Sequence, residues 1–283
     1  MWSREKVTKF SIILLAAAGI FLSLFPACGK GETELIVAGS TSVQPYAEIL
    51  AEEFALVHPE SPVEIQGGGS SAGIAAAESG TADIGMSSRY LKEKEELQGL
   101  KDVAIAIDGL AIIVNISNPL SNLGLEQIRQ IYTSDNETRI SNWKELGGRD
   151  AKIHVITREE GSGTRSAFEE QIMVEEWITP KAIVLNSNGS IGQQVELDPD
   201  AIGFISLGLV KEYNVKAVNL DGIAPTNANV ANGSYSLSRP FLFITKGEST
   251  GKARQFIDFI LSKDGQDVLV REGLISVNEG KAE

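Results

Sequence analysis

Short apolar runs alternate with longer amphipathic segments from residue 34 onward. Residues 43–57 place apolar side chains three and four positions apart, which predicts a helix with one buried face, and a shorter helix over 71–79 ends at Gly80. Strands are expected where apolar runs are short and bounded by turn residues: 34–39, 62–66, 81–86, 152–157 and 201–206. Further helices are expected over 125–133 and 142–148. This alternation predicts an α/β protein built from strand–helix–strand units.

Two apolar segments are candidates for strands that leave one part of the fold and enter another. Residues 103–115 form a nearly unbroken apolar run with one acid, and residues 239–246 form the second segment. If both cross, the middle of the chain forms a separate lobe, and a helix over 253–270 returns to the first lobe. The expected bounds are 34–112 and 239–283 for the first lobe and 113–238 for the second. A cleft between two α/β lobes is a common place for a small-ligand site.

The first 33 residues are typical of an export signal followed by a tether. A basic start precedes an apolar run of about 16 residues, which is too short to predict a membrane-spanning helix. The small residue before Cys28 resembles the bacterial lipoprotein signal, in which the chain is cut before the cysteine and a diacylglycerol is attached to its sulfur. We therefore expect a signal peptide over 1–27, lipid on Cys28, a polar tether over 28–33, and an exported, membrane-anchored protein. Ordinary secretion without a lipid is the alternative.

Charge and composition exclude several classes of partner. The chain has 38 Asp and Glu against 25 Lys and Arg, so its formal net charge is −13. A field of this sign repels nucleic acid and anionic membrane surfaces, and we expect membrane contact only through the lipid. One cysteine allows no disulfide framework, two histidines with scattered carboxylates predict no metal site, and no G-x-x-x-x-G-K-[ST] motif is present. We expect a monomer without a cofactor.

Three loops rich in Gly, Ser and Thr each lie between a predicted strand and a predicted helix. They are GSTS (39–42), GGGSSAG (67–73) and GSGT (161–164). Glycine lets the backbone approach a ligand, and hydroxyls beside a helix N-terminus favour an anion without adding charge. Any one loop is more often a simple helix cap, but three in the same context, the third flanked by Arg158 and Arg165, predict an anion site.

Two further segments carry candidate polar groups. MSSR (86–89) ends a predicted strand, so Ser88 and Arg89 are expected to point into the same cleft, although a turn with a solvated arginine is the alternative. Asp108 interrupts an apolar crossing strand, where a carboxylate is rarely placed without a partner. Its alternative is a turn or cap residue. Whether Arg165 reaches the site or the surface stays open from the sequence.

A serine hydrolase is the enzymatic alternative. GSSAG (69–73) fits G-x-S-x-G with Ser71 as the nucleophile, and Asp108 and His154 follow in the chain order of α/β-hydrolases. The fit is superficial, because His154 alternates with apolar residues inside a predicted strand instead of lying in a late loop.

The order of GSTSVQP, GGGSSAG, DIGMSSR, DGLAIIVN and REEGSGTR resembles the phosphate-binding lipoproteins that serve ATP-driven phosphate importers. The resemblance covers essentially the whole mature chain. It implies a type II periplasmic-binding-protein-like fold, in which two lobes close over a dehydrated phosphate and deliver it to an ABC-type membrane permease without chemistry on the ligand. A receptor for sulfate or molybdate is the main alternative, and a phosphate sensor would share the same site.

The resemblance also implies roles for particular residues. The residues that match the family's phosphate contacts are Thr41, Ser70, Arg158, Ser162, Gly163 and Thr164. Ser42 and Ser71 are neighbouring candidates. Glu160 falls where the family often places an acid that pairs with the binding arginine. Longer members carry a strand-end aspartate that accepts the proton of bound phosphate, whereas this chain has Ser88 followed by Arg89. We therefore expect Asp108 to supply the acceptor and Arg89 to act beside Arg158 as a charged donor.

Overall fold

The computed structural model describes residues 34–278, which belong to one compact unit that begins at Glu34. The expected signal peptide, the lipid site at Cys28 and the tether over 28–33 all lie outside the described residues. Within that described range, no helix has the length and apolar character needed to cross a membrane.

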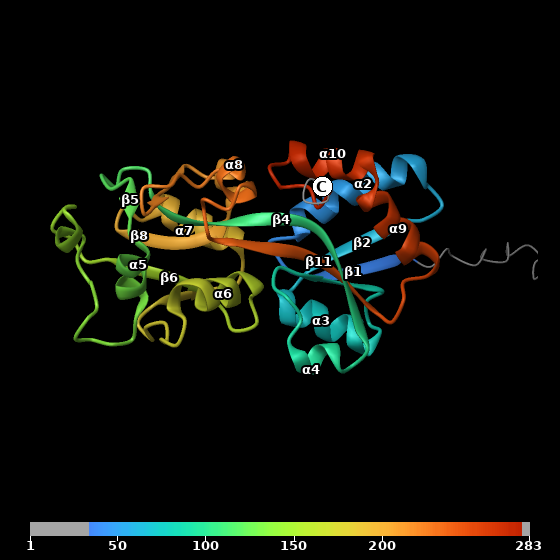
Figure 1. Ribbon diagram of the computed structural model, residues 1–283, viewed down its shortest axis with the longest axis horizontal. Coiled ribbons are helices and arrows are strands. Elements are labelled where there is room, and N and C mark those ends of the chain that lie inside the picture. The colour runs from blue at the N-terminus through green and yellow to red at the C-terminus, as the bar shows by residue number, and fades with distance from the viewer. Residues whose placement is uncertain (1–33, 279–283) are drawn as a thin grey trace, which may run out of the picture. The chain divides into compact units, whose positions relative to one another are not determined.

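The centre of the fold is a mixed sheet in which β4 is shared by two halves (Figure 1). The strand order is β2-β1-β3-β11-β4-β8-β6-β7, with β9 also paired to β4. The strand bounds are β1 Leu35–Gly39, β2 Val63–Gly67, β3 Ile84–Ser87, β4 Leu100–Asn115, β6 His154–Arg158, β7 Ile183–Leu185, β8 Ala201–Ser206, β9 Val215–Ala217 and β11 Ser238–Lys246. A small separate pair consists of β5 (Asn122–Leu123) and β10 (Asn219–Leu220).

The long strand β4 changes partners in its middle. Its residues from Leu100 to Gly109 pair antiparallel with β11, and those from Leu110 to Val114 pair with β8. The strand expected over 103–115 is thus a single strand of 16 residues. We call β2, β1, β3, β11 and the first part of β4 the first half-sheet, and the second part of β4 with β8, β6, β7 and β9 the second half-sheet.

The helices pack around the two half-sheets (Figure 1), and α2, α3, α6 and α7 each begin shortly after the end of a strand. Their bounds are α2 Gln44–Val57, α3 Ser70–Ser79, α4 Glu93–Glu96, α5 Leu125–Tyr132, α6 Gly163–Phe168, α7 Asn188–Leu197, α8 Asn227–Ala231, α9 Gly251–Leu261 and α10 Lys263–Arg271. The segment expected to be a helix over 142–148 is a short 3₁₀ helix at Trp143–Leu146, and a π-helix at Glu169–Met173 extends α6.

The expectation of one C-terminal helix over 253–270 is wrong. Ser262 takes an extended backbone conformation (φ −66°, ψ 166°) that ends α9, and its hydroxyl accepts a hydrogen bond from the Gly265 N–H at the start of α10. A serine that caps the next helix competes with continuation of the previous one, because its side chain satisfies backbone donors only in a non-helical conformation.

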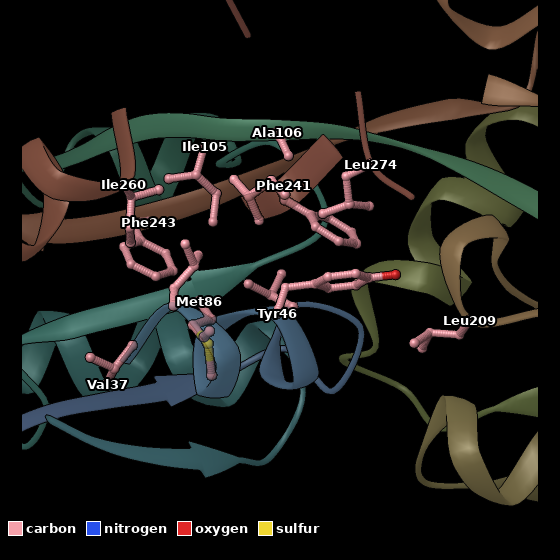
Figure 2. Packing of buried hydrophobic residues seen from close by; sticks show 14 of the residues in the cluster. Val37, Tyr46, Met86, Ile105, Ala106, Leu209, Phe241, Phe243, Ile260 and Leu274 are labelled. Atoms are coloured by element: carbon pink, nitrogen blue, oxygen red, sulfur yellow. The ribbon is translucent and has the colours of Figure 1, made fainter. Parts of the chain in front are cut away.

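Two apolar clusters fix the helices to the strands. In the first, side chains of β1, β3 and β11 meet those of α2 and α9, as Val37, Met86, Phe243, Tyr46 and Ile260 show in Figure 2. In the second, Phe168 of α6 stacks on Phe204 of β8 with ring centroids 4.1 Å apart. Aromatic pairs of this kind contribute about 0.5–1.5 kcal/mol beyond their buried area. Packing therefore fixes where each helix begins relative to its neighbouring strands.

Candidate functional site

Each of the three predicted loops turns from the carboxyl end of a strand into a helix. The loop over 39–42 lies between β1 and α2, the one over 67–73 between β2 and α3, and the one over 161–164 between β6 and α6. Gly39 has φ +143°, and a Cβ added there would lie 2.3 Å from the Met86 carbonyl oxygen, so no other residue fits without a shift. The loops therefore bring hydroxyls and helix N-termini to the edges of both half-sheets.

Loops from the two half-sheets contact one another directly. Ser42 Oγ lies 2.8 Å from Thr164 Oγ1, and the Ser71 N–H donates to the Gly161 carbonyl at 3.0 Å. Both side chains of the hydroxyl pair are 1% exposed. Residues that the sequence placed in separate loops thus lie side by side in a buried polar cluster.

A second group of hydroxyls joins this cluster around Ser88. The Ser88 N–H donates to Ser70 Oγ at 3.0 Å, and Ser40 Oγ donates to Ser88 Oγ at 3.0 Å. Gly163 packs against the same atoms: a Cβ there would lie 2.3 Å from Ser70 Oγ and 2.5 Å from Ser88 Oγ. Ser162 instead caps α6, since its Oγ accepts a hydrogen bond from the Arg165 N–H at 3.2 Å.

Arg158 is buried at the end of β6 and reaches the first loop. Its Nη2 donates to Thr41 Oγ1 at 3.2 Å, and its Nη1 lies 3.5 Å from Thr164 Oγ1. The carboxylate that pairs with it belongs to Glu159, whose two oxygens accept from Nε and Nη2 at 2.8 Å each. The expectation that Glu160 pairs with Arg158 is wrong, because Glu160 lies exposed on the turn that follows.

Asp108 has a different role from the expected proton acceptor. Its Oδ1 accepts from the Ser206 hydroxyl at 2.8 Å, and its Oδ2 accepts from Nε and Nη2 of Arg239 at 3.2 and 3.0 Å. Three donated hydrogen bonds therefore reach the two carboxylate oxygens. This geometry does not favour the expected role as acceptor of the phosphate proton, and Asp108 instead anchors Arg239.

The strand register explains this pair. β11 runs antiparallel to β4 and places Arg239 directly opposite Asp108. Burial raises the pKa of Asp108, although the Arg239 charge opposes the shift, and burial lowers the pKa of Arg239. Burial also raises the pKa of nearby Tyr46, as does the charge of Asp108.

Sequence reasoning missed Asn188 and Arg239. Asn188 is fully buried at the start of α7; its Nδ2 donates to Ser42 Oγ at 2.8 Å, and its Oδ1 accepts from the Ser206 N–H at 3.2 Å. The segment NSNGS (186–190) between β7 and α7 is a fourth strand-loop-helix turn with polar side chains, and that local pattern could have indicated Asn188. Arg239 carries no comparable local signal.

Two other arginines are occupied by neighbouring groups. Arg89 donates to both oxygens of Glu95 at 2.8 and 2.9 Å, to the Tyr90 carbonyl, and to Ser71 Oγ at 3.3 Å. The expectation that Arg89 offers its charge to an anion is therefore not supported by the geometry. Arg165 donates to Glu169 at 2.8 Å and to the Arg158 carbonyl at 3.1 Å, which makes it a brace between α6 and β6.

The residues of the hydrolase alternative do not assemble. His154 lies at the start of β6, at the opposite end of that strand from Arg158, and pairs with Asp198 at 2.7 Å. Ser71 is bonded to Arg89, and Asp108 is bonded to Arg239 and Ser206. Since a serine nucleophile needs a base within hydrogen-bond reach, the geometry does not favour this chemistry.

The partners of Ser42 determine which hydroxyl of the Ser42–Thr164 pair donates. Ser42 Oγ accepts from Asn188 Nδ2 and from Arg239 Nη2, which uses both of its lone pairs. Its own proton must then go to Thr164 Oγ1, and the Thr164 proton is left to be donated elsewhere. At this pair the donors therefore outnumber the acceptors, as an oxyanion site requires.

Comparison with known proteins identifies the family. A model of the PBP superfamily domain matches residues 27–264 of this chain. The phosphate-binding protein PstS of Bacillus subtilis is 32% identical over 297 residues, which cover 98% of this chain and 96% of that protein. PstS of Borreliella burgdorferi is 30% identical over 268 residues, which cover 90% of this chain and 95% of that protein.

Solved structures agree with the sequence comparison. A Clostridium perfringens structure, described as that of a phosphate ABC transporter substrate-binding protein with bound phosphate, is 45% identical with a TM-score of 0.82, and the match covers 87% of this chain and all of that one. A phosphate transport receptor from Vibrio cholerae is 41% identical with a TM-score of 0.70, and covers 85% and 99%. These likenesses confirm the predicted fold class. The chain therefore belongs to the PBP superfamily and, within it, to the family of PstS phosphate-binding proteins.

Proposed function

We propose that this chain is an extracytoplasmic solute-binding protein that captures inorganic phosphate and delivers it to an ABC-type permease. The relatives named for phosphate binding support the ligand, and the solved structures named for phosphate ABC transport support the route. The chain performs no chemistry on the ligand in this proposal, which fits the separation of Ser71, Asp108 and His154.

One observation carries the ligand proposal: a buried polar cluster with surplus donors forms where loops of the two half-sheets meet. Arg158 supplies charge-assisted donors, and the N-termini of α2, α3 and α6 supply partial positive charge. The proposed contacts with phosphate, from side chains and from loop N–H groups, are Thr41, Ser42, Ser70, Ser71, Ser88, Arg158, Ser162, Gly163 and Thr164. These groups outweigh the diffuse negative charge of the surface, because Coulomb energy falls with distance and is screened in water.

The two half-sheets support a proposal for the lobes. We take residues 34–112 and 239–283 as the first lobe and 113–238 as the second. This boundary lies just past Gly109, after which β4 pairs with β8 of the second half-sheet. The two loop sets are in contact at Ser42 and Thr164, as expected for closed lobes. The ligand would then lie between them, away from water.

The N-terminal segment supports export and anchoring. We propose that residues 1–27 are removed and that Cys28 carries a lipid that holds the protein at the outer side of the cytoplasmic membrane. Incorporation of a labelled fatty acid into the parent and not into a Cys28→Ser variant tests this step. Equal labelling of both chains would overturn it.

The hydrogen bonds of Asp108 keep sulfate and molybdate as a second class of candidate ligand. Near neutral pH phosphate carries a proton and needs an acceptor, whereas sulfate and molybdate need only donors, and the oxygens of Asp108 are occupied by Arg239 and Ser206. Ser88 offers a hydroxyl that can accept as well as donate, which favours phosphate.

Calorimetry of the full-length chain, stripped of ligand by dialysis and titrated in turn with phosphate, arsenate, sulfate and molybdate, tests the proposed function. We expect phosphate and arsenate to bind and sulfate to bind at least about 10³-fold more weakly, since a polar site rejects a ligand that leaves its groups unpaired. Tight sulfate binding together with weak phosphate binding would identify sulfate as the ligand and overturn the proposal.

A further inference from the structure

We propose that Arg239 is a second arginine of the ligand site and binds the oxyanion directly through Nη1. This inference rests on the proposed function and concerns the same site. Arg239 lies near the start of β11, with a side chain that is 1% exposed, and its charge is balanced by Asp108 at 3.0 Å. It is therefore a fixed donor that the fold holds in place before any ligand arrives.

The planar guanidinium indicates where Nη1 points. Asp108 Oδ2 accepts from Nε and Nη2, so that edge of the group is occupied. The remaining Nη2 hydrogen reaches Ser42 Oγ at 3.1 Å. Because the five N–H bonds form a rigid fork, one hydrogen of Nη1 runs parallel to that bond and points toward the same side as Ser42.

Nη1 itself is a donor without a partner. It is buried, and within the described part of the chain it makes no hydrogen bond. An unsatisfied buried donor costs about 1–3 kcal/mol, and native proteins rarely keep one without a use. A ligand oxygen on the Ser42 side would supply the missing acceptor.

The position of Arg158 supports a shared anion. Ser42 contacts Arg239 on one side and Thr164 on the other, and Thr164 in turn lies 3.5 Å from Arg158. Burial lowers the pKa of Arg239, and the positive charge of Arg158 lowers it further, because the two guanidinium groups repel each other. A tetrahedral oxyanion placed between them relieves this repulsion and accepts from both.

The test compares phosphate binding by the parent, Arg239→Lys, and the double variant Asp108→Asn with Arg239→Gln. Lysine keeps the charge but lacks the second edge of the fork, and the double variant removes the pair without leaving one charge unpaired. We expect a loss of at least about tenfold for the lysine variant and about thirtyfold for the double variant. A matched double variant, Glu126→Gln with Arg129→Gln, removes an ion pair of α5 and should stay within about threefold.

Two results separate failure of this inference from failure of the proposed function. A parent that binds no phosphate overturns both, whereas a parent that binds phosphate with folded Arg239 variants within about threefold overturns the role of Arg239 alone. A crystal structure of the unchanged chain with phosphate needs no variant. Nη1 within about 3.2 Å of a phosphate oxygen supports the inference, and a separation above about 4 Å overturns it.

Discussion

The two arginines of the candidate site are paired with carboxylates in different ways. Arg158 and Glu159 are neighbours in sequence, and the glutamate side chain remains 29% exposed. Arg239 and Asp108 are 131 residues apart, and neither side chain is more than 1% exposed. Water can replace Arg158 as the partner of Glu159, whereas Asp108 is closed to water and keeps only Ser206 when Arg239 is lost. The first pair can adjust when a ligand arrives, whereas the second is part of the scaffold.

The largest expected effect comes from breaking the scaffold pair. Asp108→Asn leaves the Arg239 charge buried and unpaired, so we expect the free energy of unfolding of the ligand-free chain to fall by about 3–5 kcal/mol. Urea denaturation of parent and variant measures it. A loss below about 1 kcal/mol would show that Arg239 finds another partner or reaches solvent.

The same variant tests whether Asp108 accepts a ligand proton. Since both carboxylate oxygens already accept from Ser206 and Arg239, we expect phosphate and sulfate affinities to change together, with their ratio constant within about threefold. Competition calorimetry at fixed pH and ionic strength gives the ratio. A ratio that narrows by about tenfold or more would restore Asp108 as the acceptor.

The next effect concerns the adjustable pair. Arg158→Ala removes a buried donor that contacts Thr41, and we expect phosphate binding to weaken by about 2–5 kcal/mol. The free energy of unfolding should fall less than in Asp108→Asn, because Glu159 is left with access to water. Calorimetry beside Arg165→Ala, which removes an arginine bonded to Glu169, provides the contrast. Equal losses in both variants would place Arg158 outside the site.

The comparison also explains how much of the site the sequence could predict. The three loops were predictable because a strand end, glycine, hydroxyls and a helix N-terminus are local features, and the structure brings Ser42, Ser70 and Thr164 into one cluster. Arg239 was not predictable, since its place depends on the register of β11 against β4. Such register arises from packing of distant segments and leaves no mark beside either residue.

Smaller errors have local causes. Ser262 had the residue type of a helix cap, but the apolar spacing on both sides of it favoured one continuous helix. The resemblance indicated Glu160 as the acid that pairs with Arg158, but the pair forms one position earlier, at Glu159. β6 ends at Arg158, so Glu160 already lies on the exposed turn.

Close packing at the cluster gives a smaller effect than the loss of Asp108 or of Arg158. Gly163→Ala adds a methyl group 2.3 Å from Ser70 Oγ and 2.5 Å from Ser88 Oγ, so these hydroxyls must move. We expect about 1–3 kcal/mol of lost stability in the ligand-free chain, the usual cost of overpacking. Urea denaturation beside Gly80→Ala separates space from backbone strain, since Gly80 has φ +74° but open surroundings. If Gly163→Ala has the same free energy of unfolding as the parent, the loops can move apart without loss of stability.

The smallest expected effect decides which acid holds Arg158. Glu159→Gln keeps the shape of the side chain but removes the charge and one of the two acceptors that meet Nε and Nη2 at 2.8 Å. Because that side chain is 29% exposed, solvent screens the pair, and we expect only about 1 kcal/mol of lost stability. Glu160→Gln, on the exposed turn next to it, should stay within about 0.5 kcal/mol of the parent. Paired urea denaturation curves at one pH and ionic strength resolve the two. A larger loss of stability from Glu160→Gln than from Glu159→Gln would identify Glu160 as the acid that pairs with Arg158.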